Sequence, residues 1–193
     1  MTNETLKVNF LASAINFAKK KIKLLILLLV FILIFLFSYL LYENFKNSAN
    51  IQIAEKYTRA SILIKQKKIE EGKILLEAVI KKNHQFYSPL SLYLIIDNDL
   101  ETDNKKIISF FDQILKNNSI SNENLNLIKI KKAIYLINTD DEKMIIKTLN
   151  PVINSNSAWR EIAINLITDY FLSKDQKIKA EEYNQLLKNK TKK

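Results

Sequence analysis

The chain has 193 residues with no cysteine, one histidine and one glycine, and its formal net charge is +10. Without cysteine and with one histidine, thiol nucleophiles, histidine-based triads and multi-histidine zinc sites are excluded or nearly so. A single glycine provides neither a phosphate-cradling loop nor the frequent turns of a β-rich fold. We therefore expect an all-α protein with no enzymatic activity, no cofactor, no metal and no small-molecule substrate.

Residues 1–23 form a basic tail ahead of the first apolar run. Within it, "TLKVNFLASAINFAKK" places Leu6, Phe10, Ile15 and Phe17 at spacings that are compatible with a short amphipathic helix on a membrane surface. An unstructured tail is equally compatible with this stretch, and the two alternatives stay open.

Residues 24–42 carry no charge and are nearly all Leu, Ile, Val or Phe. At about −0.3 to −0.6 kcal/mol for each such residue, membrane insertion is favourable by roughly 5–10 kcal/mol. As a helix the run is about 28 Å long, close to the hydrocarbon thickness of about 30 Å. A cleaved signal would end in small residues, but Glu43-Asn44-Phe45-Lys46 follows here, so we expect an uncleaved transmembrane anchor in a lipid bilayer.

The charges on the two sides of this anchor predict its orientation, because lysine and arginine accumulate on the cytoplasmic side. The lysines that flank the anchor on its N-terminal side are Lys19, Lys20, Lys21 and Lys23. Fewer basic residues follow over a similar distance. We expect a single-pass protein of the bacterial cytoplasmic membrane, with residues 1–23 in the cytoplasm and the C-terminal domain in the periplasm.

The charge of the remaining chain argues against nucleic-acid binding. Residues 43–193 have a net charge of +6, which falls to +2 without the four lysines of the C-terminal tail, residues 188–193. We interpret that tail as a solvated basic end.

Residues 43–187 contain four successive stretches, each made of two helix-like segments around a short polar break. In the second segments, apolar triplets superimpose, and their middle members are 35, 38 and 34 residues apart. The triplets are Leu76/Val79/Ile80, Phe111/Ile114/Leu115, Leu149/Val152/Ile153 and Tyr183/Leu186/Leu187. This period is typical of tetratricopeptide repeats. An irregular helical bundle is the alternative.

The first segments support the same reading, because two of them share apolar residues spaced 4, 3 and 4, which lie on one helix face. They are Ile53-Tyr57-Ala60-Ile64 and Trp159-Ala163-Leu166-Tyr170, and Phe86-Leu90-Tyr93 and Ile130-Ala133-Ile137 keep parts of the stripe. We expect an α-solenoid of about four degenerate tetratricopeptide-like hairpins, with polar breaks at 67–68, 97–104, 138–141 and 173–175.

Three features resemble sites but have simpler interpretations. Asp97 to Asp103 has oxygen ligands at the first positions of a calcium loop, but Thr102 and Ile108 stand where glycine and glutamate are needed. We interpret the stretch as a helix-capping turn. His84 is expected to be exposed or capping, and Trp159 to pack in the core.

The layout of one N-terminal membrane helix and about four such hairpins resembles the YfgM-type family of ancillary translocon subunits, whose domain is related to that of the cell-division coordinator CpoB. The most similar stretch is "NSAWREIAINLITDYFLSKDQKIKAEEYNQLL". An Asn-Pro-Trp-Arg-like motif of that family maps onto Asn156, Trp159, Arg160 and Ala163, with Ala158 in place of proline. Small residues at the helix crossings are rare here, Gly72 and Ala180 being exceptions.

This resemblance implies a periplasmic scaffold that binds proteins near the Sec translocon and assists the hand-off of exported proteins to periplasmic chaperones. The alternative is a structural or adaptor subunit of another inner-membrane assembly, in envelope biogenesis or cell division. The partner-binding residues are not predicted by the sequence.

Overall fold

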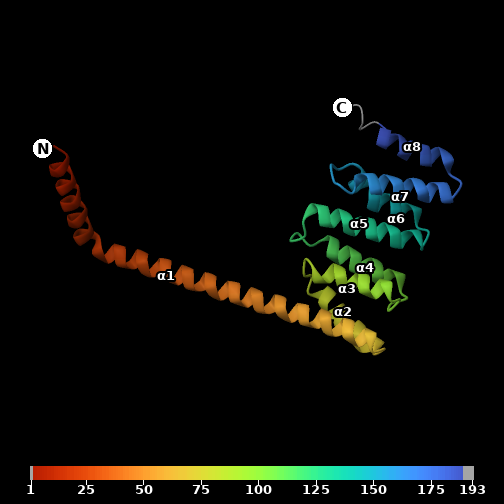
Figure 1. The fold of residues 1–193 in the computed structure, drawn as a ribbon, viewed down its shortest axis with the longest axis horizontal. Helices are drawn as coiled ribbons and strands as arrows, with labels where there is room; N and C mark the ends of the chain where they lie inside the picture. The colour runs from red at the N-terminus through yellow and green to blue at the C-terminus, as the bar shows by residue number, and fades with distance from the viewer. Residues whose placement is uncertain (1, 189–193) are drawn as a thin grey trace. The chain divides into compact units, whose positions relative to one another are not determined.

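The protein is described by a computed structural model that gives the backbone of residues 2–188 and the side chains of residues 21–24, 26–43 and 47–187. Over these residues the regular structure is entirely helical (Figure 1), which confirms the all-α prediction. The helices are α1 (Thr2–Lys65), α2 (Ile69–Lys81), α3 (Tyr87–Asp97), α4 (Asn104–Leu115), α5 (Asn122–Ile137), α6 (Glu142–Ile153), α7 (Arg160–Ser173) and α8 (Lys177–Lys188). Of the predicted basic tail, residues 189–193 lie outside the described residues.

The chain divides into two compact units, Met1–Gln52 and Ile53–Lys193. The first unit belongs to α1, whose backbone leaves helical geometry at Lys21 (φ −114°, ψ 15°). The backbone of residues 2–20 is helical, so of the two alternatives for the tail the structure has the helix. The side chains of Leu6, Phe10, Ile15 and Phe17 lie outside the described residues, and the placement on a membrane surface stays a prediction. From Lys21 onward, α1 is long and apolar enough to cross a membrane, and the described side chains of the predicted span, such as Leu27 and Phe31, are exposed.

The second unit is built by helices that each pack against the next one along the chain from α2 to α8. The helix α5 also contacts α7, two positions further on. The four predicted breaks agree with the observed helix ends to within one or two residues, and three further breaks lie at 82–86, 116–121 and 154–159.

Helix ends in this chain use the left-handed backbone conformation without glycine. Lys67, Asn83, Asp99, Asp140 and Asp175 all have φ between 51° and 63°, and each follows the end of a helix. At Lys67 the backbone N–H donates to the Ile64 carbonyl, and the next N–H donates to the Leu63 carbonyl. These are the two bonds of a Schellman motif. Asparagine and aspartate tolerate this conformation better than other non-glycine residues, which explains how a chain with one glycine makes many tight helix turns.

Three helix starts are capped by side chains, one of them in the predicted capping turn before residue 104. Asp103, Ser121 and Asp141 accept backbone N–H bonds at the starts of α4, α5 and α6, which satisfies donors that the helix itself leaves unpaired.

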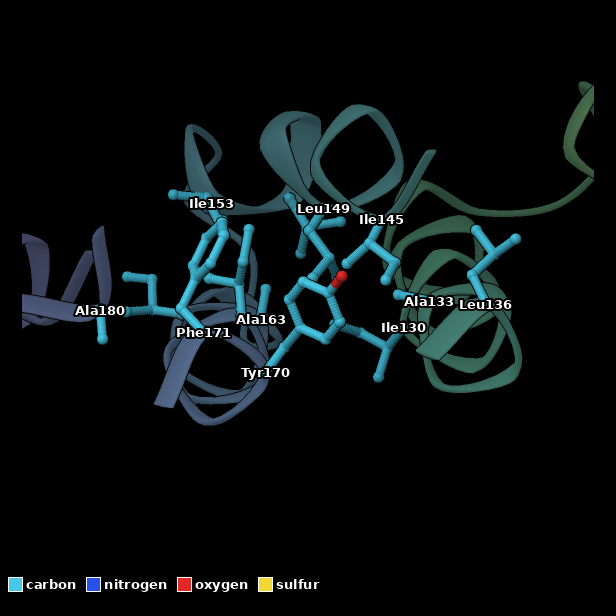
Figure 2. Packing of buried hydrophobic residues seen from close by; sticks show 13 residues of the cluster. Ile130, Ala133, Leu136, Ile145, Leu149, Ile153, Ala163, Tyr170, Phe171 and Ala180 are labelled. Carbon is cyan, nitrogen blue, oxygen red and sulfur yellow. The ribbon is translucent and has the colours of Figure 1, made fainter. Parts of the chain in front are cut away.

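The buried apolar residues form two clusters that meet within α5. One joins the end of α1 with α2, α3, α4 and the start of α5, around Phe111 and Leu76. The other joins α5 to α8, and Figure 2 shows Tyr170 and Phe171 of α7 among side chains from α5 and α6. The first three predicted triplets are buried except for the half-buried Leu115, and the fourth is half-buried throughout.

Candidate functional site

A cavity of about 130 Å³ opens between α3 and α5, and Phe111 of α4 also lines it. Its walls come from three consecutive helices. The lining residues are Tyr93, Ile96, Asp97, Phe111, Lys131, Ile134, Tyr135 and Asn138. Because α3 and α5 are the first helices of two successive predicted hairpins, the cavity lies where the inner wall of a solenoid would be.

Most of the cavity surface is apolar. Phe111 is fully buried, and its ring centroid lies 6.2 Å from that of Tyr135. The Tyr135 hydroxyl donates to Asn104 Oδ1 at 2.5 Å, which fixes this ring at the edge of α4. Ile134 is 46% exposed, although it belongs to the helix that anchors both cores. An exposed isoleucine beside a buried aromatic floor provides a contact surface for another apolar group.

Two charges stand at the cavity without ion-pair partners among the described residues. Lys131 places its Nζ 5.7 Å from the ring centroid of Tyr93, and no carboxylate pairs with it. Asp97 is the last residue of α3, and no cation pairs with it. A negative charge at the C-terminal end of a helix is disfavoured by the helix dipole. The cavity thus combines apolar walls with one cation and one anion that form no ion pair within the described part of the chain.

The hydroxyl of Tyr93 is buried and has no hydrogen-bond partner in the described part of the chain. Burial raises the pKa of Tyr93 to about 12. Burial also raises the pKa of Tyr135, and the negative charges of Asp103 and Glu101 raise it further. Both phenols are therefore neutral hydrogen-bond donors at physiological pH.

Beside the cavity, the turn from Asp97 to Asp103 contributes to an ion-pair cluster that joins α2 to α4. Glu101 accepts from Lys106 at 2.8 Å and from Lys73 at 3.2 Å, and Lys106 also pairs with Glu77 at 2.7 Å. The hydrogen bond from Lys106, followed by the backbone N–H of Asp103, lowers the pKa of Glu101 to about 2. These contacts, with the Asp103 cap, confirm the reading of this stretch as a helix-capping turn. No group of metal-ligating side chains is assembled anywhere in the residues described.

The residues of the predicted family motif lie away from the cavity, at the junction of α6, α7 and α8. Trp159 is half-buried at the start of α7 and packs on the second core, and Ala163 is fully buried. Arg160 donates from Nε to the Ile153 carbonyl at 2.9 Å and from Nη2 to the Leu186 carbonyl at 3.0 Å. The three residues therefore have structural roles in this chain.

His84 caps the start of α3, which is one of the two roles expected for it. Its Nδ1 accepts from the backbone N–H groups of Phe86 and Tyr87, both at 3.1 Å. Its own backbone N–H donates to Ser88 Oγ at 2.8 Å. Burial lowers the pKa of His84, which keeps the accepting nitrogen unprotonated.

Of the predicted membrane-flanking lysines, Lys21 and Lys23 are exposed, and Lys21 stands at the break in α1. The side chains of Lys19 and Lys20 lie outside the described residues.

Sequence reasoning placed Tyr93 in a helix stripe but did not identify the cavity. The missed signal is the face formed by Lys131 and Ile134 of α5 and by Asn138, which caps its C-terminal end; their spacing of three and four residues places them together. The sequence does not separate Lys131 from its neighbour Lys132, which is buried and pairs with Asp112 at 2.6 Å. No protein-family model, no curated protein and no solved structure matches this chain.

Proposed function

We propose that this protein is a membrane-anchored, non-catalytic scaffold whose second unit is a solenoid of tetratricopeptide-like hairpins that binds other proteins. The observation that carries the proposal is the cavity between α3 and α5, which has apolar walls and two charges without an ion-pair partner among the described residues. Sequential packing of each helix on the next supports the solenoid. In stacked hairpins the first helices form one wall of the solenoid. Two of these first helices, α3 and α5, line the cavity.

Attachment to a membrane would keep this binding surface close to partners at the membrane. A helix that is long and apolar enough to span the bilayer precedes the second unit in the same chain. Confinement to a thin layer raises the effective concentration of the binding surface for partners at the membrane. With the N-terminal lysines in the cytoplasm, the surface faces the periplasm. There, the resemblance to YfgM-type proteins supports a role beside the Sec translocon in handing exported proteins to chaperones.

The proposal is tested by a photo-crosslinking amino acid at Ile134, followed by mild-detergent solubilisation and affinity capture through a C-terminal tag. The matched control carries the crosslinker at Ile74 of α2, which is 64% exposed and does not line the cavity. We expect covalent adducts with the secretion channel or periplasmic folding factors from position 134 and not from position 74.

If only division or envelope-assembly proteins were crosslinked at position 134, the proposed partner would be another assembly and not the translocon. A crosslinking pattern at position 134 that equals the pattern at position 74 would contradict a binding role for this surface.

A further inference from the structure

We propose that the cavity between α3 and α5 receives one apolar side chain, of leucine or phenylalanine size, from an extended peptide segment. The main chain of that segment lies between Asp97 and Lys131. This inference rests on the proposed function, in which the segment belongs to a partner protein, and it goes further by specifying the chemistry of the occupant.

The size of the cavity selects a single side chain. Its volume is about 130 Å³, and an apolar cavity of roughly 150 Å³ holds one benzene ring. Its walls include the aromatic rings of Phe111, Tyr93 and Tyr135, which suit an aromatic or branched aliphatic guest. A folded domain surface has no group that enters such a space except one protruding side chain.

The polar groups at the cavity select a peptide main chain around that side chain. A peptide presents both N–H donors and C=O acceptors next to each side chain. Asp97 accepts from an N–H, whereas Lys131 and the Asn138 amide donate to a carbonyl. The negative charge that the dipole of α3 disfavours is then compensated by the bound donor.

Other classes of ligand match the same groups less well. A phosphate is attracted by Lys131 but repelled by Asp97, and a metal ion has the opposite conflict. A free amino acid, with an ammonium for Asp97 and a carboxylate for Lys131, is the remaining competitor and is included in the test.

The test uses the full chain in lipid nanodiscs and N-acetyl-4-fluoro-L-phenylalanine amide, a blocked residue with one ring and peptide groups on both sides. Binding is read from broadening of its ¹⁹F signal. Ile134→Trp fills the mouth of the cavity, and Ile74→Trp places the same side chain on an exposed site of α2. We expect wild type and I74W to bind alike, and I134W to bind about tenfold more weakly or not at all.

A second variant keeps the inference testable if I134W unfolds. Asp97→Asn retains the shape of an exposed side chain, and we expect several-fold weaker binding of the blocked probe with a melting temperature no lower than that of the wild type, because the helix dipole disfavours the charge that is removed. Equal broadening by wild type, I134W and D97N would overturn the inference. Tighter binding of free 4-fluorophenylalanine than of the blocked probe would overturn the assignment of a peptide.

The two proposals fail separately. Probe binding without protein adducts at Ile134 would overturn the scaffold function, because the cavity would then be occupied by something other than a partner protein. Protein adducts at Ile134 without probe binding would overturn the side-chain inference alone.

Discussion

Arg160 joins three helices through two hydrogen bonds from one guanidinium. It reaches the last carbonyl of α6 and a carbonyl near the end of α8, while its own backbone begins α7. Helix C-terminal carbonyls lack partners within the helix and carry partial negative charge. A planar cation with several donors satisfies two of them at once, which lysine does not do with the same geometry.

We predict that Arg160→Lys destabilises the second unit by about 1–3 kcal/mol, since at least one hydrogen bond from a charged group is lost. The measurement is urea unfolding of the full chain in detergent, monitored by circular dichroism. Arg59→Lys is the control, because Arg59 is exposed on α1, and its change should stay within about 0.5 kcal/mol. Equal effects of the two variants would show that the bridge contributes nothing.

His84 makes the start of α3 sensitive to pH. Its Nδ1 accepts two backbone N–H groups only when it is unprotonated. Because burial lowers the pKa of His84 below 6.5, the stabilisation is fully present above the unfolded-state value. It is lost as the pH falls through the folded-state pKa.

We predict that the melting temperature of the wild type falls between pH 7.5 and pH 5 more than that of His84→Asn. Asparagine also caps helices but does not titrate. Parallel pH profiles of the two proteins, recorded by thermal melting in the same buffers, would contradict this role of the ring.

At the scale of elements, the single glycine sets how closely α2 approaches the end of α1. A methyl group built on Gly72 would lie 2.7 Å from Ile64 Cγ1 and 3.2 Å from the Ala60 carbonyl oxygen. All three residues belong to the second unit. Helix propensity favours alanine over glycine by about 1 kcal/mol, so packing and propensity oppose each other here.

We predict that packing dominates and that Gly72→Ala lowers the unfolding free energy by about 1–2 kcal/mol, because a backbone oxygen cannot move aside. Glu71→Ala, an exposed change in the same helical turn, should alter it by no more than about 0.5 kcal/mol. Denaturant unfolding of both variants measures the difference. A stabilised Gly72→Ala protein would mean that α2 shifts freely.

At the scale of the whole molecule, α1 contains a long apolar segment, and the second unit has a hydrophobic core of its own. The described side chains from Ile26 to Tyr42 are exposed, which water does not tolerate for a continuous run of this length. The hydrocarbon interior of a membrane accommodates such a helix, because the backbone hydrogen bonds of a helix are satisfied internally.

We predict that wild-type protein stays in the membrane fraction after carbonate washing and that a Leu33→Lys/Phe35→Lys variant is largely released. Two lysines at the centre cost about 5–7 kcal/mol of insertion free energy, which offsets most of what the run supplies. The control is Ile74→Lys/Ile178→Lys, which adds the same charges to exposed sites of the second unit. Release of the wild type would contradict a spanning helix.

The sequence by itself determined the helical class, the apolar run, the positions of four breaks between helices and most of the buried triplets. These properties depend on local quantities, namely charge-free length, a period of about 3.6 residues and the residues that end helices. The tail of residues 2–20 was left open because its pattern admits both a helix and an unstructured segment, and the backbone shows a helix.

Only the tertiary structure decided which residues meet across helices. Arg160 and Leu186 are 26 residues apart, and the cavity joins Asp97 to Lys131 through a floor at Phe111. Such meetings depend on the angle and distance at which helices pack, which the spacing of apolar residues leaves undetermined. For the same reason Lys131 and Lys132, neighbours in sequence, have opposite environments, one free at the cavity and one buried on Asp112.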